Sequence, residues 1–192
     1  EALGVAVFRG SESDVLGRYR GAAAMLKVDT ILRVTSDCPL IDPILCNQVL
    51  ERVKSGKVDF ACNNMPPSWP HGLDCEAVSF KWLDRAFRNA GENFEREHVM
   101  PWVRNHLDTK KSNVPGPGEG IEDQRWTLDN ERDLEFLRAL WERFPTDGPE
   151  SWSYTVPLAI IHAEPHLLNI NTCQGRLKGL KKVRGRFKFD KR

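Results

Sequence analysis

The sequence predicts an α/β domain built around a mostly parallel sheet. Short apolar stretches rich in β-branched residues alternate with longer stretches whose apolar residues recur every three or four positions. The chain of 192 residues is long enough for one such domain. Because parallel strands need a helical crossover between them, this alternation indicates βαβ units.

The bulk composition is that of an ordinary globular protein, and it narrows the function classes. The chain is 40% hydrophobic and 29% charged, and it has no run of about 18 apolar residues, so no membrane span is expected. The net charge of +1 gives no general argument for nucleic acid as a partner. The five cysteines are odd in number and lack a C-x-x-C spacing. They indicate reduced thiols in a cytoplasmic protein and not a disulfide framework or a zinc site.

Strands and helices alternate in the first 63 residues. Two helix starts are marked by capping residues: Asp14 follows a run of Ser and Glu, and Asp42 precedes Pro43, a residue favoured at the first helical position. Apolar residues at helical spacing follow both positions. The expected elements are a strand over 4–8, a helix over 15–26, a strand over 30–35, a helix over 43–53 and a strand over 59–63.

Proline and glycine divide the rest of the chain into further elements. The stretch 65–72 holds three prolines, and NVPGPGEG at 113–120 is typical of a turn. Asn130 and Asp133 form an arrangement like a capping box at a helix start. The expected elements are a strand over 73–78, a helix over 79–90, a helix from about 95 to 107, a strand over 124–128 and a helix from 131.

Charge divides the chain into two parts. Residues 174–192 carry nine Lys or Arg and one Asp, a balance of +8, whereas the remainder is acidic. We therefore expect a domain over residues 1–172 and a basic C-terminal tail over 173–192. A solvated terminus is the ordinary interpretation of such a tail, and binding to an anionic glycan, lipid or nucleic acid is the alternative.

Two aspartates follow expected strands at the point where each strand ends. Asp37 comes after the strand over 30–35, in the sequence RVTSDCPLIDP, and Asp129 comes after the strand over 124–128. Ligands of open α/β sheets bind outside the carboxyl ends of the strands, and Mg²⁺ prefers oxygen ligands there. Aspartate is equally a favoured N-cap and turn residue, so a structural role for each is the competing interpretation.

Other charged residues have two interpretations each. Asp74 and Glu76 lie two apart, so on a strand they would share a face, either toward a ligand or toward solvent. Arg96 and His98 could contact an acceptor carboxylate or a phosphate, or could be structural helix residues. Arg125 could contact a phosphate or form a structural ion pair.

Four segments resemble the cytidylyltransferases of the spore-coat polysaccharide type, relatives of the synthetases that make CMP-Kdo and CMP-sialic acid. RVTSDCPLIDP at 33–43 resembles the family's R-[IV]-T-G-D-C-P-L-I-D-P, and PHGLDCE at 70–76 resembles its Y-P-D-G-L-D-V-E. EREHVMP at 95–101 resembles S-E-R-E-H-V-x-P, and RWTLDNERDLE at 125–135 resembles R-W-T-[VL]-D-x-x-E-D-L-E. The segments occur in the family's order between about Val7 and Leu140.

The resemblance implies a fold, an activity and a set of site residues. The fold would be a three-layer, Rossmann-like mixed sheet of the nucleotide-diphospho-sugar transferase type. The activity would be Mg²⁺-dependent transfer of CMP from CTP to a sugar or sugar acid, with release of pyrophosphate, in surface polysaccharide biosynthesis. The implied metal ligands are Asp37 and Asp129, with Arg125 as a third catalytic residue. The implied substrate-binding residues are Gly72, Asp74, Glu76, Arg96 and His98.

The chain departs from the family pattern in ways that limit the prediction. No phosphate-binding loop follows a first strand, so we expect that the chain lacks the first strands of the fold and is not a competent catalyst alone. His71 stands where the family has Asp, and Ser36 stands where it has Gly. The alternatives are the same fold using another nucleotide, or a non-catalytic remnant that binds a sugar ligand or a protein partner. A homodimer is the expected assembly, because relatives of this fold are commonly dimers.

Overall fold

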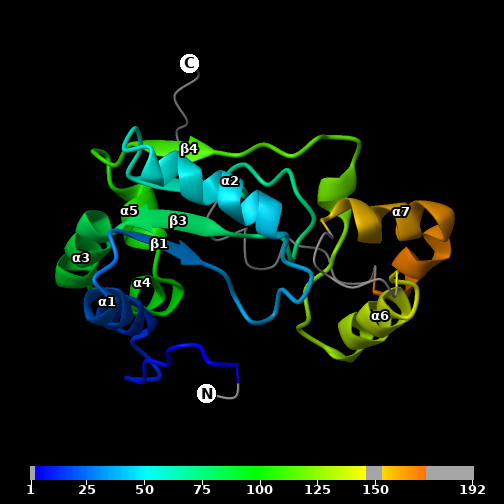
Figure 1. Cartoon of the computed structure of the whole chain (residues 1–192), viewed down its shortest axis with the longest axis horizontal. Coiled ribbons are helices and arrows are strands. Elements are labelled where there is room, and N and C mark those ends of the chain that lie inside the picture. Colours follow the sequence, from blue (N-terminus) through cyan, green and yellow to red (C-terminus); the bar gives the residue numbers. More distant parts are fainter. Residues whose placement is uncertain (1–2, 146–152, 172–192) are drawn as a thin grey trace. The chain divides into compact units, whose positions relative to one another are not determined.

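The computed structural model describes residues 3–145 and 153–171 as an α/β protein (Figure 1). The chain divides into two compact units, each assembled from separate segments of the sequence. Unit 1 comprises Glu1–Leu32, Leu50–Ala61 and Ala77–Ser112. Unit 2 comprises Arg33–Val49, Cys62–Glu76 and Asn113–Arg192. The domain boundary expected after residue 172, and the tail beyond it, lie outside the described residues.

The described strands form one sheet of four, in the spatial order β1-β3-β2-β4. Backbone hydrogen bonds from Phe80 to Asp29 (2.8 Å) and from Ser79 to Asp59 (3.0 Å) place the end of β3 beside the starts of β1 and β2. β3 is therefore antiparallel to both neighbours. β4 is parallel to β2, because the bonded pairs advance together along the two strands. The strands are β1 (Thr30–Arg33), β2 (Phe60–Cys62), β3 (Glu76–Ser79) and β4 (Lys111–Asn113).

The sheet is mixed, as predicted, but the prediction that it is mostly parallel is wrong for its strand pairs. Because β3 lies between β1 and β2 and runs against both, two of the three pairs are antiparallel. Residues 63–75 connect β2 to β3 without a helix. A connection without a crossover helix returns the chain as an antiparallel neighbour.

Unit 1 contains a cluster of helices whose starts follow the predicted capping residues. The Asp14 side chain accepts a hydrogen bond from the Gly17 backbone N–H (2.9 Å) and so caps α1. α1 packs against α3 and α4, burying Leu16 and Ala23. The helices predicted over 15–26 and 79–90 are thus confirmed. The helices are α1 (Val15–Leu26), α3 (Phe80–Asn89), α4 (Asn93–His98) and α5 (Pro101–Asn105).

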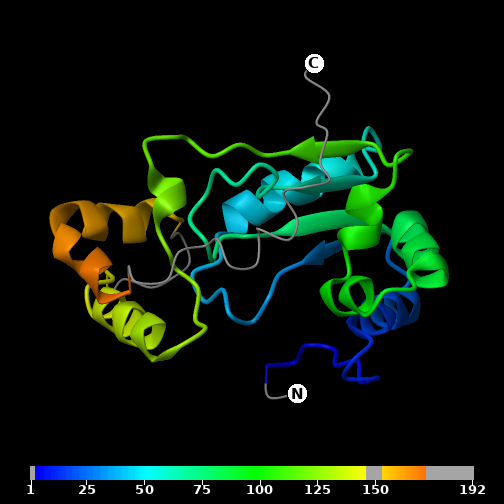
Figure 2. The ribbon, with the colours of Figure 1, turned by 180° about the vertical axis from the view of Figure 1, so that it is seen from behind.

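Helix α2 (Pro43–Lys54) begins in unit 2 and ends in unit 1. Figures 1 and 2 show it as a single continuous helix. The helix predicted over 43–53 is confirmed, and its buried residues Leu45, Cys46, Val49 and Val53 recur at helical spacing. Ile44, which was expected on the apolar face, is exposed.

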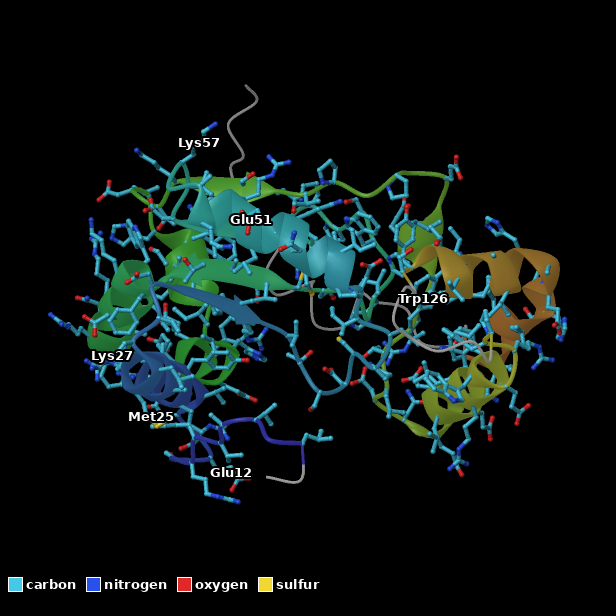
Figure 3. All side chains as sticks on the ribbon, viewed as in Figure 1. Glu12, Met25, Lys27, Glu51, Lys57 and Trp126 are labelled. Atoms are coloured by element: carbon cyan, nitrogen blue, oxygen red, sulfur yellow. The ribbon has the colours of Figure 1, made fainter. Side chains whose placement is uncertain are left out.

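Unit 2 is built from loops and a small group of helices. Asn130 caps α6 by accepting a hydrogen bond from the Asp133 backbone N–H (3.2 Å), and Phe136 and Leu140 are fully buried. Trp126, labelled in Figure 3, is also fully buried. α6 and α7 both pack against η3. The helical segments are η1 (Ile121–Asp123), α6 (Glu131–Trp141), α7 (Thr155–Ala163) and η3 (Pro165–Ile170).

The strand predicted over 4–8 is absent from the described structure. This stretch has no regular structure, and the side chains of Val5 and Val7 are exposed. No described strand pairs with it, and a strand without a hydrogen-bonded neighbour is not stable. The ring of Phe8 instead lies against Gly21 of α1.

The single helix predicted from about 95 to 107 is two short helices. α4 ends at His98, the next residue, Val99, has a φ of +68°, and Pro101 occupies the first position of α5. Proline lacks the N–H of a helical hydrogen bond and its ring clashes with the carbonyl four residues earlier, so one helix cannot run through residue 101. Val99 and Val103 are nevertheless fully buried, as their apolar spacing predicted.

The strand predicted over 124–128 is reduced to one parallel bridge between His71 and Arg125. Conversely, β4 (Lys111–Asn113) was not predicted. Its sequence is polar, and it lies at the edge of the sheet, where packing demands little of its side chains. Across the described parts of the chain, no helix is long and apolar enough to cross a membrane.

Candidate active site

Asp37 lies in the loop after β1, within unit 2, and its main chain is bound to the segment that carries Asp129. The Asp37 carbonyl accepts hydrogen bonds from the Leu128 backbone N–H (2.8 Å) and from the Thr127 hydroxyl (2.9 Å). Thr127 is fully buried. The structure therefore brings together the two turns whose aspartates were predicted to hold a metal ion.

The second aspartate of the same sequence motif, Asp42, has a structural role. Its carboxylate accepts backbone hydrogen bonds from Ile44 (2.7 Å) and Leu45 (2.9 Å), which caps α2. Its other oxygen accepts one from the Tyr154 backbone (2.7 Å), at the start of α7. Asp42 is buried, so these bonds satisfy a carboxylate that solvent does not reach.

Arg125 is the centre of an ion-pair network in unit 2. Its Nε and Nη2 bind the two oxygens of Asp133 at 2.9 and 2.7 Å, a two-bond geometry. Nη2 also binds Asp129, and Nη1 lies 3.2 Å from Nδ1 of His71. Asn171 adds bonds to the Arg125 carbonyl (3.0 Å) and to Asp133 (3.3 Å). The side chain of Arg125 is only 12% exposed, and that of Asp133 is 1% exposed.

The network sets the protonation of Asp133. Burial alone raises the pKa of this carboxyl, but hydrogen bonds from Arg125, the Asp129 backbone and Asn171, with the Arg125 charge, outweigh burial and hold the pKa below its usual value. The Arg125 pKa is raised, chiefly by its hydrogen bond to Asp133. Both groups are therefore charged at neutral pH, and the pair locks Asp129 and the start of α6 together.

We expect the Asp133→Asn variant to be less stable than the wild type by about 2 kcal/mol at pH 7, because hydrogen bonds to a charged group are lost. Since the folded pKa of Asp133 is depressed, its stabilisation is complete above the unfolded value of about 3.9 and is lost as pH falls through the lower folded value. Urea unfolding at pH 7, 5 and 3 measures this. The gap between the two proteins should shrink only below about pH 4. A difference in unfolding free energy that stays the same at all three pH values would contradict the lowered pKa of Asp133.

Asp129 retains the chemistry of a metal ligand. Its side chain is 48% exposed, and Arg125 binds its Oδ2. A carboxylate can accept from about four directions, so one ion pair leaves it able to bind a cation as well. No cluster of three or more His, Cys, Asp or Glu that could hold a metal ion occurs among the described residues. Two carboxylates fit Mg²⁺, which usually takes one or two of them and completes its shell with water and phosphate oxygens.

Cys38, next to Asp37, is not suited to nucleophilic chemistry. Burial, more than any other effect, raises the pKa of its thiol to about 12; a hydrogen bond with Thr35 opposes this and the charges of Asp37 and Asp74 add to it. At neutral pH the group is a thiol, and the thiolate is the reactive form.

The predicted substrate-binding residues of the 70–76 segment occupy different environments. Gly72 is buried with φ of +115°, and a Cβ there would lie 2.5 Å from the Trp126 carbonyl carbon. Asp74 lies 3.9 Å from Nε2 of His71. Glu76 is buried and binds Arg33 (3.1 Å), so it is not on a solvated strand face. Sugar contacts by these three residues remain predictions.

Arg96 and His98 belong to unit 1, where both make local contacts. Arg96 donates hydrogen bonds to the carbonyls of Phe87 (2.9 Å) and Ala90 (3.1 Å), at the end of α3. Its guanidinium also lies over the Phe87 ring. The His98 ring packs against Phe94, with ring centroids 4.5 Å apart. These contacts suffice to explain both residues structurally, and their predicted contacts with substrate stay untested.

Comparison with known proteins identifies the class and then the family. The mixed α/β fold matches that of a solved nucleotidyltransferase, a cytidylyltransferase from Leptospira borgpetersenii, with a TM-score of 0.78 at 29% identity over 86% of this chain and 69% of that one. The family model described as cytidylyltransferase matches residues 1–163. The chain belongs to this family.

Two curated relatives agree with the family assignment. One is an uncharacterized protein of Methanocaldococcus jannaschii, MJ1063, 32% identical over 74% of this chain. The other is the spore coat polysaccharide biosynthesis protein SpsF of Bacillus subtilis, 29% identical over 73% of this chain. In each comparison the match spans 58% of the relative's length.

Proposed function

We propose that this protein transfers CMP from CTP to the hydroxyl of a sugar or sugar acid, releasing pyrophosphate, with Mg²⁺ held by Asp37 and Asp129. One observation carries the proposal. In this member of the cytidylyltransferase family, the Asp37 carbonyl is hydrogen-bonded to Thr127 and Leu128, so the turn of Asp37 adjoins the turn of Asp129. Their oxygens are the ligand type that Mg²⁺ prefers.

The geometry gives each residue a task in this reaction. A magnesium ion supplies charge neutralisation to the triphosphate when it is bound. Asp37 and Asp129 would hold that ion, since the Asp37 carbonyl is bound by the Leu128 N–H and the buried Thr127 hydroxyl. Arg125 orients Asp129 through their ion pair while remaining paired with Asp133. Phosphoryl transfer depends mostly on such positioning and on electrostatic stabilisation.

The proposed acceptor site is the Asp74 carboxylate. Asp74 lies 3.9 Å from Nε2 of His71, and a carboxylate there could accept hydrogen bonds from sugar hydroxyls. The name of the Bacillus subtilis relative associates that protein with spore coat polysaccharide biosynthesis. We propose by analogy that this protein activates a sugar for a surface polysaccharide in the cytoplasm, as a homodimer.

The direct test is product formation. The protein is incubated with CTP, Mg²⁺ and a panel of neutral sugars and sugar acids, and CMP-linked products are sought by mass spectrometry with pyrophosphate release measured in parallel. We expect a CMP-sugar from at least one acceptor, and less product when UTP or ATP replaces CTP. No product from this chain with any acceptor would instead agree with the expectation that it is not a competent catalyst alone. Product formed equally from other nucleotides would contradict the assignment of CTP.

Replacing the metal ligand should abolish this activity without unfolding the protein. We expect Asp37→Asn to lower the rate by about 10²- to 10³-fold, the usual loss when one electrostatic group is removed from a transition state. The hydrogen bond that the Cys38 thiol donates to the Asp37 carboxylate is long, 3.7 Å, so its loss should change the melting temperature little. Asp108→Asn, at an exposed position in unit 1, is the control and should leave the rate unchanged.

A further inference from the structure

His71 lies between two candidate site residues and is held there by its backbone. Its N–H donates to the Gln124 carbonyl (3.0 Å), and its carbonyl accepts from the Trp126 N–H (2.6 Å). These bonds fix the loop against the segment on either side of Arg125. The imidazole therefore has little freedom to move away from the guanidinium.

The two ring nitrogens of His71 have different partners. Nδ1 lies 3.2 Å from Arg125 Nη1, and Nε2 lies 3.9 Å from Asp74 Oδ2. Arginine is always protonated and can only donate hydrogen bonds. Nδ1 must therefore present its lone pair to Arg125, which leaves the ring proton on Nε2, facing Asp74.

The identity of this residue matters for the distribution of charge. Arg125 already serves two carboxylates, Asp133 and Asp129. An aspartate at position 71 would be a third carboxylate competing for the same cation, whereas a neutral imidazole accepts one N–H without drawing the guanidinium away. His71 thus accepts a hydrogen bond from Nη1 of Arg125, while Nη2 stays bound to Asp129.

We propose that His71 is a positioning residue that, as the neutral Nε2–H tautomer, orients Arg125 toward the metal ligand Asp129. The proposal rests on the proposed function, because it assigns Asp129 to the metal. The contacts that carry it run from His71 to Arg125 and from Arg125 to Asp129.

The first arm of the test observes the tautomer directly. Long-range ¹H–¹⁵N NMR of the ¹⁵N-labelled wild-type protein at pH 7.5 distinguishes protonated from unprotonated imidazole nitrogens, and comparison with His71→Asn assigns the His71 signals. We expect an unprotonated Nδ1 and a protonated Nε2. A protonated Nδ1 would overturn the proposal whether or not the protein binds nucleotide.

The second arm of the test measures the effect of His71 on nucleotide binding. His71→Asn retains an oxygen that can accept from Arg125, and His71→Leu does not; His166→Leu, at a largely exposed histidine, is the matched control. By calorimetric titration of CTP with Mg²⁺, we expect His71→Leu to weaken binding at least tenfold and His71→Asn to restore it to within about threefold of the wild type, equivalent to about 0.7 kcal/mol.

Two results separate the failure of this inference from that of the proposed function. Wild-type binding of CTP with Mg²⁺ that persists unchanged in His71→Leu would overturn the positioning role alone. Wild-type protein that binds no CTP would overturn the proposed function, and the tautomer would then decide the His71–Arg125 contact by itself. Circular dichroism of each variant ensures that only folded protein is compared.

Discussion

Arg125→Met is expected to lower the free energy of unfolding by about 3 to 5 kcal/mol, since it leaves the buried Asp133 carboxylate without its cation. Asp133 is 1% exposed, so water cannot replace the lost partner. For a chain of this length each kcal/mol lowers the melting temperature by about 2 to 4 °C, so a fall of about 6 to 20 °C is expected. Thermal unfolding followed by circular dichroism measures it.

Arg143→Met is the matched control for this substitution. Arg143 binds Glu164 through Nε at 2.8 Å, a distance like those within the Arg125 network, but both side chains are substantially exposed. Water and salt screen such a pair, so its removal should have little effect on the melting temperature. A loss in Arg125→Met no larger than that in Arg143→Met would contradict the structural role of the Arg125 network.

Gly72→Ala is the second change with a large expected effect, about 3 kcal/mol of destabilisation. Its φ of +115° is strained for any residue with a Cβ, and a Cβ would lie 2.5 Å from the Trp126 carbonyl carbon. Backbone atoms cannot move aside as a flexible side chain can. The loop that carries His71 would therefore separate from residues 124–127, and CTP binding should weaken along with stability.

Gly56→Ala separates the two causes of that effect. Gly56 also has positive φ, +73°, but a Cβ there would meet nothing within 4 Å. It should cost only the conformational penalty, about 1 kcal/mol. Equal melting temperatures for the two alanine variants would show that the close approach of Gly72 to Trp126 contributes nothing.

Much of the fold was predictable from local pattern. The helices with caps, such as those after Asp14 and Asn130, begin where their capping residues indicated. The wrong predictions concern segments whose secondary structure depends on a partner strand elsewhere in the chain. The apolar stretch 4–8 is a strand only if a neighbour pairs with it, and the polar β4 is a strand because an edge position pairs it with β2. The direction of β3 depended on the absence of a helix in 63–75, which the sequence did show.

The candidate site was predicted less completely. The sequence identified Asp37 and Asp129, because both follow apolar stretches and lie in recognisable motifs. It did not identify Arg33 as the partner of Glu76, Asn171 as a partner of Asp133, or the contact of His71 with Arg125. These contacts join residues 38 to 54 positions apart, and no periodicity spans such distances. One available signal was the departure at His71 from the family's aspartate.

Calorimetric titration of CTP in the presence and absence of Mg²⁺, performed on the wild type and on Asp37→Asn, tests the central claim most directly. That claim is that the Asp37 and Asp129 carboxylates bind a metal–nucleotide complex. The account predicts binding that requires Mg²⁺ in the wild type and is lost in Asp37→Asn while the melting temperature is kept. Binding that is independent of Mg²⁺, or equal in the two proteins, or absent from both, would contradict it.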